Sequence, residues 1–335
     1  MKAMVFLGHK KFEIQDIATP KPNSDRVVLK VIAAGVCGSD IDGYARENGR
    51  RFAGQIMGHE AVGVVADATK ENANLLGMSM TFTPIIACGN CHECARGADN
   101  LCASRQLIGV HPDVPGAFAE YVQVPVKNLF PAKSSAISTL AEPLSVIWQA
   151  INAFKNLYDG NVLILGAGTI GSLTAFTLRT RDKKVVDIFD PLMWKADWLT
   201  EFGISNLKAL PPEEGIIPLQ TNSKSYGVVI DCVGNTQTLN SAIALVTPGG
   251  HVHIVGMAVP KVELNIQMLV KREVTLTTSY AYRRDIFNAV ATALPNFADS
   301  LEGIGAINCS LDNAPERFAS LLDEDNRIKK LVIVP

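Results

Sequence analysis

The sequence lacks an excess of either charge, and it lacks long apolar runs. Its 31 Lys and Arg residues against 33 Asp and Glu residues give a formal net charge of −2, so overall charge offers no attraction for nucleic acid or an anionic membrane. No run approaches the roughly 20 apolar residues of a membrane span, and MKAMVFLGHKK is interrupted before a signal-peptide core could form. We therefore expect a cytoplasmic protein whose partner is a small molecule, with no nucleic-acid or membrane partner.

The sequence has an odd number of cysteines, so they cannot all be paired in disulfides within the chain. Its seven cysteines, in a chain expected in the cytosol, indicate thiols and metal ligands rather than a disulfide framework. What is present suits folded cores: 335 residues, 47% hydrophobic and 19% charged, predict about two globular domains.

The pattern of the chain changes near Glu142. Before it, short strand-like runs such as DRVVLKVIAAGVC are broken by Gly, Pro and Asn clusters, which predicts an irregular, mostly β domain. After it, apolar strands alternate with helical segments, which predicts a parallel sheet with covering helices. A helix candidate, DNAPERFASLLDED, and a strand, KKLVIVP, close the chain.

The segment NVLILGAGTIGSLTAF contains Gly166, Gly168 and Gly171 in G-x-G-x-x-G spacing, directly after an apolar strand. These glycines permit the tight turn, the approach of a pyrophosphate and close helix–strand packing. The N–H groups of Thr169 and Ile170 would then face the phosphates at a helix N-terminus. Such turns are common, so the glycines alone are a weak signal.

A carboxylate strengthens the prediction of a dinucleotide site. Asp190 ends KKVVDIFD, 190 − 166 = 24 residues after the first glycine, where a second strand presents an acid to the adenosine ribose. An anion there repels a 2′-phosphate, so NAD is favoured over NADP. Asp190 could also cap a helix that begins near Leu192, and the two roles are compatible.

Four cysteines lie close together in ACGNCHECARGADNLC. Cys88, Cys91, Cys94 and Cys102 form C-x2-C-x2-C-x7-C, which suits a closed tetrahedral zinc site. Iron–sulfur runs have a shorter last gap followed by proline, and a redox dithiol is expected at a strand–helix junction. We therefore predict a structural zinc lobe over residues 87–103.

Other metal-binding residue types are scattered through the chain. Cys37 lies in VCGSD, His59 and Glu60 lie in GHEAVG, and Glu142 lies in AEPLSV. Cysteine, histidine and carboxylate are ligands of catalytic zinc, which keeps one position open. Spacing alone does not assemble them, and taken singly each is explained by an ordinary role: a buried free thiol, a satisfied histidine or an exposed carboxylate.

Taken in order, these motifs resemble the zinc-containing medium-chain dehydrogenase/reductase family of the alcohol dehydrogenase superfamily, and within it the sorbitol dehydrogenase-like polyol branch. The resemblance spans nearly the whole chain and rests on GVCGSD, GHEAVGVV, the cysteine lobe, GAFAEYV, AEPLSV, GAGTIG, DCVGN, PGGHVHIVG and IKKLVIVP. It implies a GroES-like β-rich catalytic domain over residues 1–145 and 280–335. It also implies a Rossmann NAD-binding domain with a doubly wound parallel sheet over 146–279, and an active site between the two.

The resemblance also implies the metal site. Cys37, His59 and Glu142 match the ligands of the catalytic zinc, and Glu60 matches a ligand or near-ligand that exchanges with water. Ser39 matches the hydroxyl that takes the proton of the alcohol.

Four further positions follow from the resemblance. Asp40 matches the carboxylate that orients the histidine ligand. Asp42 stands where alcohol dehydrogenases often carry a relay histidine, so the end of the proton path is open. Lys195 matches a basic residue near the adenosine ribose, and Val255, in PGGHVHIVG, joins the cofactor site.

The implied function is hydride transfer between NAD and a secondary alcohol of a polyol, sugar alcohol, sugar acid or sugar phosphate. Two zinc ions per subunit and a homodimer or homotetramer are expected with it. In YARENGRRF, Arg46, Arg50 and Arg51 suggest an anionic substrate, either a sugar acid or a sugar phosphate, against the alternative of an ordinary solvated basic loop.

Several other functions stay open at this point. Within the family, the chain could be an L-threonine or 2,3-butanediol dehydrogenase. Outside it, the alternatives are a non-catalytic NAD-binding sensor, a zinc-free quinone reductase and a zinc-ribbon interaction module.

Overall fold

The structure is a computed structural model that describes residues 1–47, 49, 51–154, 161–182, 184, 186–195, 199–200, 204, 207–208, 226–301, 306–323 and 326–335. The chain forms two compact units. The first contains Met1–Pro143 and Arg283–Pro335, and the second contains Leu144–Tyr282. The predicted fold class, a GroES-like β-rich domain with a Rossmann-type parallel-sheet domain, is confirmed.

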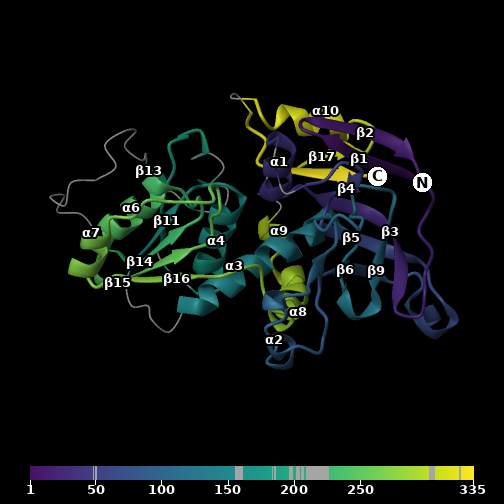
Figure 1. Ribbon diagram of the computed structural model, residues 1–335, viewed down its shortest axis with the longest axis horizontal. Coiled ribbons are helices and arrows are strands. Elements are labelled where there is room, and N and C mark those ends of the chain that lie inside the picture. The colour runs from purple at the N-terminus through teal and green to yellow at the C-terminus, as the bar shows by residue number, and fades with distance from the viewer. Residues whose placement is uncertain are drawn as a thin grey trace. The chain divides into compact units, whose positions relative to one another are not determined.

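The first unit is built mainly from strands (Figure 1). Its largest sheet has the order β10-β6-β5-β3-β18-β17, with β9 also paired to β3, beside a three-stranded sheet β2-β1-β4 and a pair β7-β8. The strands are β1 (Lys2–Gly8), β2 (Lys11–Asp16), β3 (Arg26–Gly35), β4 (Gln55–Ile56), β5 (Glu60–Asp67), β6 (Ser79–Phe82), β7 (Ile85–Ile86), β8 (Gln106–Leu107), β9 (Tyr121–Pro125), β10 (Leu129–Pro131), β17 (Ala306–Ser310) and β18 (Lys330–Val334).

Short helices join these strands. The α-helices are α1 (Gly38–Ala45), α2 (His92–Ala95), α8 (Arg284–Ala293), α9 (Ala298–Leu301) and α10 (Ala314–Ser320), and the 3-10 turns are η1 (Lys70–Leu75), η2 (Asp99–Leu101), η3 (Val126–Asn128), η4 (Ala136–Leu140) and η5 (Leu294–Asn296). Helix α3 (Ala141–Phe154) carries the chain from the first unit into the second.

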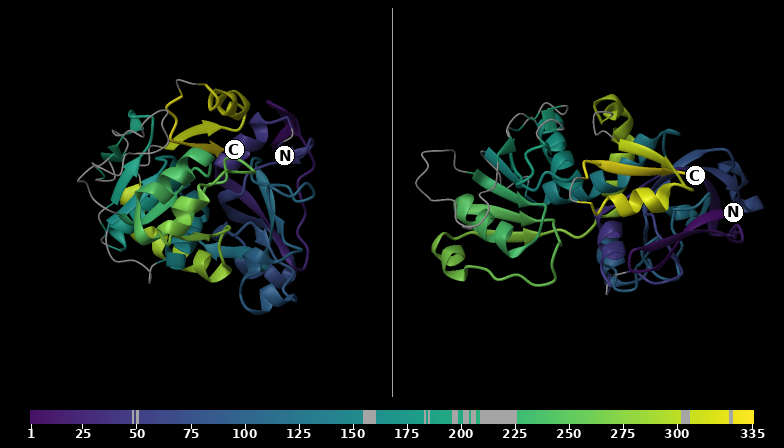
Figure 2. Two further views of the ribbon diagram at one scale, coloured as in Figure 1. Left: turned by 60° about the vertical axis from the view of Figure 1, so that its left-hand side comes forward. Right: turned by 90° about the horizontal axis from the view of Figure 1, so that it is seen from above.

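The C-terminal segment completes the first unit. Strand β18 pairs antiparallel with β3, with Val332 opposite Gly35, and the yellow C-terminal elements lie beside the purple N-terminal strands in Figures 1 and 2. Phe318, on α10, is fully buried and packs edge-on against Phe12 and Tyr44, with ring centroids 4.9 and 5.1 Å away. Buried aromatic groups contribute a large apolar area to such a core. The tail therefore belongs to the same core as the N-terminal strands.

The second unit is a six-stranded parallel sheet of order β13-β12-β11-β14-β15-β16. This is the order of two mononucleotide-binding halves that diverge from a central pair of strands. The strands are β11 (Asn161–Leu165), β12 (Val186–Phe189), β13 (Leu207–Lys208), β14 (Tyr226–Asp231), β15 (Val246–Ile254) and β16 (Thr275–Thr278), and the helices are α4 (Thr169–Thr180), α6 (Thr236–Leu245) and α7 (Ile266–Lys271).

The central strands of this sheet are apolar because both of their faces are covered. In β11, residues Val162 to Leu165 are fully buried, and Val228, Val229 and Ile230 of β14 are buried beside them. Parallel strands bring their carboxyl ends to one edge of the sheet. The turns after β11, β12, β14 and β15 therefore gather at that edge.

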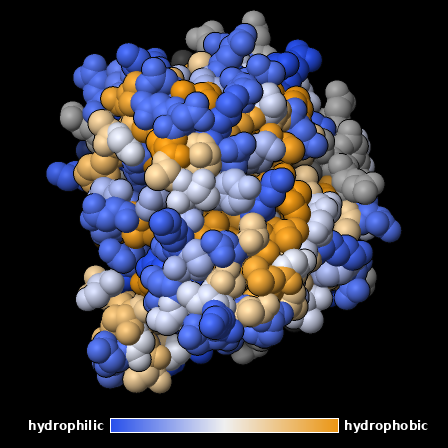
Figure 3. All heavy atoms as spheres, turned by 90° about the vertical axis from the view of Figure 1, so that its right-hand side faces the viewer, coloured by the Kyte–Doolittle hydropathy of each residue, from blue (hydrophilic) through white to orange (hydrophobic). Residues whose placement is uncertain are grey.

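The surface is mixed in character. On the face drawn in Figure 3, hydrophobic residues lie in patches separated by hydrophilic ones, as is usual for globular proteins. Within the described part of the chain, none of the helices combines the length and the apolar character that crossing a membrane requires.

Candidate active site

Three predicted metal ligands meet where strand β3 ends and strand β5 begins. Glu60 pairs with Gly35 in the antiparallel register of these strands, and Cys37 follows Gly35 by two residues at the start of α1. The ligand atoms of Cys37, His59 and Glu60 all lie within 4.8 Å of one another. Sheet register, rather than sequence spacing, assembles this group.

A glycine turn fixes the direction in which His59 enters the site. Gly58 has φ +98°, and a Cβ at that position would overlap the Phe118 ring. A side chain is therefore excluded there both by conformation and by packing. The turn leads directly into His59, which is only 6% exposed.

The surroundings of His59 attract a cation. Burial of the imidazole disfavours its charged form, but the negative charges of Asp40, Cys37 and Glu142 outweigh burial and raise the pKa of His59 to about 10. Its Nδ1 lies 3.6 Å from Asp40 Oδ1, an ion-pair distance. This leaves Nε2 as the ring nitrogen available to a metal, and a divalent cation would replace the proton that the site otherwise retains.

The structure adds one residue that sequence reasoning missed, Lys330. Its ammonium group donates to Glu60 Oε2 and, at 2.9 Å, to the carbonyl oxygen of Val36, and all of these groups are buried. Burial alone would lower the pKa of Lys330, but Glu60, Cys37 and Glu142 raise it, so the side chain is a buried cation. The only sequence signal was a lysine opening the apolar strand KLVIV.

Glu142 lies close to this group but outside the cluster of mutually close ligand atoms. It is 9% exposed, in the first turn of α3. Its charge acts on both His59 and Lys330. The structure therefore groups Cys37 and His59 with Glu60, and it places the carboxylate of Glu142 near enough to act on the site electrostatically.

Of the three arginines of YARENGRRF, Arg46 and Arg51 are paired with different carboxylates. Arg46 pairs with Asp42 one helical turn earlier, and Arg50 lies outside the described residues. Arg51 is turned inward: its Nη2 donates to Asp40 Oδ1 at 2.8 Å and to Ser39 Oγ at 3.2 Å. The hypothesis that Arg51 binds an anionic substrate does not fit this structure, because the guanidinium side chain is 2% exposed and already paired.

The four clustered cysteines converge as a zinc site requires. Their sulfur atoms lie within 4.8 Å of one another, with 3.5 Å between Cys91 and Cys94, 3.5 Å between Cys88 and Cys102 and 3.9 Å between Cys88 and Cys94. A tetrahedron with Zn–S bonds of about 2.3 Å has sulfur atoms about 3.8 Å apart. The four residues therefore fit structural zinc without rearrangement of the loop.

The glycine turn after β11 has the predicted geometry. Gly166 has φ +94°, and a Cβ on Gly171 would overlap the carbonyl oxygen of Gly166. Gly168 is the N-cap residue of α4, and no atom lies within 4 Å of where its Cβ would be. Thr169 and Ile170 form the first turn of this 12-residue helix. Open space at a helix N-terminus fits the pyrophosphate of a dinucleotide.

Asp190 lies beside this turn and organises it. Its Oδ2 accepts hydrogen bonds from Ala167 N at 2.7 Å and Lys195 Nζ at 2.8 Å, and its Oδ1 accepts from Leu192 N at 2.9 Å. The pairing of Asp190 with Lys195 is thus present, and its hydrogen bond from Leu192 N closes the turn that follows β12. At the neighbouring strand ends, Val255 N donates to Asp231 O at 2.9 Å, which brings Val255 to the same edge of the sheet.

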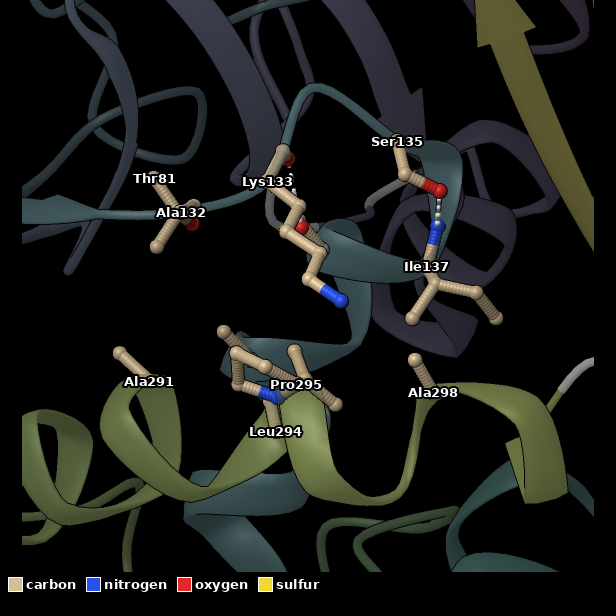
Figure 4. A pocket seen from close by; sticks show the side chains of 11 residues that line it. Thr81, Ala132, Lys133, Ser135, Ile137, Ala291, Leu294, Pro295 and Ala298 are labelled. Carbon is tan, nitrogen blue, oxygen red and sulfur yellow. Dashed lines mark hydrogen bonds between the residues drawn. The ribbon is translucent and has the colours of Figure 1, made fainter.

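The cavity drawn in Figure 4 is a different feature of the first unit. Lys133 extends into the space between Ser135 and Ile137 on one side and Pro295 and Ala298 on the other. The cavity volume is about 40 Å³, and its lining includes none of the predicted site residues.

Two consecutive family models match the chain. Residues 23–134 match "Alcohol dehydrogenase GroES-like domain" and residues 159–298 match "Zinc-binding dehydrogenase". Sorbitol dehydrogenase of Bacillus subtilis strain 168 is 24% identical over 100% of this chain and 97% of its own length. L-galactonate-5-dehydrogenase of Escherichia coli K12 is 28% identical over 78% of this chain and 77% of its own length.

A solved structure matches the whole length of the chain. The NADH complex of the alcohol dehydrogenase RspB from Escherichia coli CFT073 has a TM-score of 0.87 and 21% identity, and covers 100% of this chain and 99% of its own. The matching models, the grouped metal ligands and the glycine turn agree. The chain belongs to the zinc-containing medium-chain dehydrogenases of the alcohol dehydrogenase superfamily, and it is an enzyme of the zinc-binding alcohol dehydrogenase type.

Proposed function

We propose that this enzyme interconverts a secondary alcohol of a polyol or sugar derivative and the corresponding ketone, with zinc and NAD. The observation that carries the proposal is the grouping of Cys37, His59 and Glu60 in a chain whose second unit carries the glycine turn and Asp190. A half-buried cysteine beside a buried histidine and a buried carboxylate fits a zinc ion that keeps a position for substrate.

When bound, zinc supplies a Lewis acid that acidifies a substrate hydroxyl, and NAD accepts the hydride. The chain's own residues do the rest. Cys37 and His59 hold the metal, with Glu60 or Glu142 as the carboxylate ligand. Ser39, which is exposed, accepts the proton of the alcohol and passes it toward solvent, with Asp42 on the same helix as a later acceptor.

Asp190 supports NAD as the cofactor rather than NADP. Its carboxylate is buried to 4% exposure at the end of β12 and is held by Ala167 N and Lys195. A fixed anion at this position accepts the ribose hydroxyls and repels a 2′-phosphate. Lys195 balances part of the charge, so the preference for NAD depends on the pair.

A polyol substrate is supported by the names of the relatives. One is a sorbitol dehydrogenase and another an L-galactonate-5-dehydrogenase, and both names refer to polyhydroxylated carbon chains. Within the family, oxidation of L-threonine or 2,3-butanediol is the second candidate, because each also offers a secondary alcohol beside a second polar group.

The test is NADH formation from NAD over neutral polyols, sugar acids, sugar phosphates, butanediol and threonine, with and without prior zinc chelation. We expect activity that the chelator abolishes and that is highest with a polyol. Glu142→Ala should lower kcat at least tenfold with an unchanged melting temperature, because the side chain acts on the metal site. Turnover that survives complete removal of zinc would contradict the proposal and favour a zinc-free reductase.

We also propose that the enzyme is a homodimer or homotetramer. Strand β16 ends the order of the parallel sheet in the described residues, and Met257, Ile266 and Val270, which lie between β15 and β16 in the chain, are 59%, 58% and 64% exposed. An edge strand and exposed apolar side chains both suit a subunit contact. Light scattering of the purified protein measures the state, and a monomer at micromolar concentration would contradict this part.

A further inference from the structure

Asp40 is a fully buried carboxylate that three groups share. Its Oδ2 accepts a hydrogen bond from Cys37 N at 3.2 Å. Its Oδ1 accepts from Arg51 Nη2 at 2.8 Å and faces His59 Nδ1 at 3.6 Å. Because Asp40 is 0% exposed, its orientation is set by these partners and not by water.

Arg51 is the partner that balances the charge of Asp40. The side chains of the pair are 2% and 0% exposed. An uncompensated charge at such a depth is strongly unfavourable, whereas a close, hydrogen-bonded pair is tolerated. A neutral His59, as a metal ligand requires, cannot provide the balancing charge, so the guanidinium does.

Arg51 also contacts the relay hydroxyl. Its Nη2 lies 3.2 Å from Ser39 Oγ. A guanidinium has no acceptor, so the serine oxygen must accept in this bond. Its own hydrogen then points elsewhere, and one lone pair stays available for a substrate proton.

The path of the Arg51 side chain is built into helix α1. A Cβ on Gly43, which is buried in that helix, would overlap Cγ of Arg51. Glycine within a helix costs about 1 kcal/mol relative to alanine. Here it provides the space through which the arginine reaches Ser39 and Asp40.

We propose that Arg51 is a positioning residue of the zinc site: one buried guanidinium holds both the carboxylate that orients His59 and the hydroxyl of Ser39. This inference rests on the proposed function for the role of Ser39. The expected effect of Arg51 on metal binding does not depend on that function. Residues that orient a ligand from behind it commonly change metal affinity or activity 10- to 100-fold when replaced.

The experiment compares Arg51→Met, Arg51→Lys and the control Arg317→Met, which removes an exposed arginine of α10. Each protein is loaded with Co²⁺ at the catalytic site, and its visible spectrum and the rate of metal transfer to a chelator are recorded. We expect Arg51→Met to release the catalytic metal about 10- to 100-fold faster and to show an altered spectrum. Arg51→Lys should keep metal release closer to the wild-type rate than Arg51→Met does, and Arg317→Met should match the wild type.

Kinetics supply the second measurement, with the best substrate of the panel. Arg51→Met should lower kcat about 10- to 100-fold with the KM for NAD within twofold of wild type, and its effect should be smaller in a Ser39→Ala background. An unchanged spectrum, release rate and kcat in Arg51→Met would overturn the proposal. If Arg51→Met does not fold, the double variant Asp40→Asn/Arg51→Met, which removes both charges, is used instead. A rate of metal release equal to that of the wild type in this double variant would also overturn the proposal. If only the proposed function is wrong, Arg51→Met should still alter the Co²⁺ spectrum and the rate of metal release, and none of the tested substrates should be turned over.

Discussion

The ammonium group of Lys330 donates a hydrogen bond to the carboxylate of Glu60, which lies 270 residues earlier in the chain. Both side chains are buried, and a second bond from Lys330 to the carbonyl oxygen of Val36 fixes the ammonium beside the loop that carries Cys37. Strand β18 thus places a cation beside the proposed metal site. A metal ion held by Glu60 would compete with Lys330 for the same carboxylate.

Replacing Lys330 by Met should therefore affect the metal-free protein most. Removing one member of a buried ion pair typically costs about 3–5 kcal/mol, because the other charge is left uncompensated. Zinc should recover part of this loss, since Glu60 can then pair with the metal, and binding to the folded state adds stability. Urea unfolding measures the free energy of unfolding of the variant and the wild type, each with and without zinc. Lys30→Met, at an exposed position of β3, is the control, and an equal loss in the two metal states would contradict the explanation.

Neither the pairing of Lys330 nor that of Arg51 could be predicted from the sequence. The family resemblance carried by GVCGSD implies that Cys37, Ser39 and Asp40 act in one site. The partner of Glu60 arrives only through the pairing of β18 with β3, and a lysine opening an apolar strand carries little local signal. From the sequence, Arg51 is interpreted as a ligand of an anionic substrate or as part of a solvated basic loop, because its burial depends on the space that Gly43 leaves beside it.

The cysteine lobe and the glycine turn could be predicted because each is contained in a short segment. The sulfur atoms of Cys88, Cys91 and Cys94 have to meet if one loop is to hold a single ion, and the loop does bring them together with Cys102. Gly166 and Gly171 are required by backbone geometry alone. By contrast, the choice between Glu60 and Glu142 as a metal ligand depends on where separate elements pack, and spacing does not contain that information.

Cys94→Ser tests the structural role of the lobe. Its sulfur lies 3.5 Å from that of Cys91 and 3.9 Å from that of Cys88, so serine would leave three thiolates around the ion. We expect the zinc content to fall from two ions to one per subunit and the melting temperature to drop by several degrees, because structural zinc contributes directly to folding. Atomic absorption and calorimetry measure the two quantities. Zinc content and melting temperature equal to wild type would refute the assignment, and Cys309→Ser, a buried thiol outside the lobe, is the control.

The glycine turn offers a matched pair of substitutions. At Gly168 the backbone has φ −76° and a Cβ would meet no atom within 4 Å, so Gly168→Ala should leave the melting temperature unchanged. The added methyl group would still occupy the space expected for the pyrophosphate. We therefore expect the Kd for NADH to rise at least tenfold, measured by fluorescence titration. Gly171→Ala should instead lower the melting temperature, because its Cβ would overlap the Gly166 carbonyl oxygen. Wild-type affinity in Gly168→Ala would contradict the dinucleotide site.

Two stacked histidines of β15 should make the second unit sensitive to acid. His253 is fully buried, with Nδ1 2.8 Å from Thr277 Oγ1 and Nε2 3.1 Å from Ser279 Oγ, and the ring of His251 is stacked on it at 6.3 Å. Burial and the charge of His251 lower the pKa of His253 to about 4. A free histidine has a pKa of about 6.5. Between these values the unfolded chain binds a proton that the folded protein does not.

The free energy of unfolding should therefore fall as the pH drops from about 6.5 toward 4. At pH 5 the loss attributable to His253 is on the order of 2 kcal/mol relative to pH 7.5. His253→Gln keeps a polar group beside Thr277 and Ser279 but has no proton to gain in this range. Urea unfolding at both pH values tests the point: the variant should be less stable than wild type at pH 7.5, where only packing is lost, and the difference should shrink or reverse at pH 5. A stability difference that is the same at both pH values would show that His253 does not remain neutral in the folded protein.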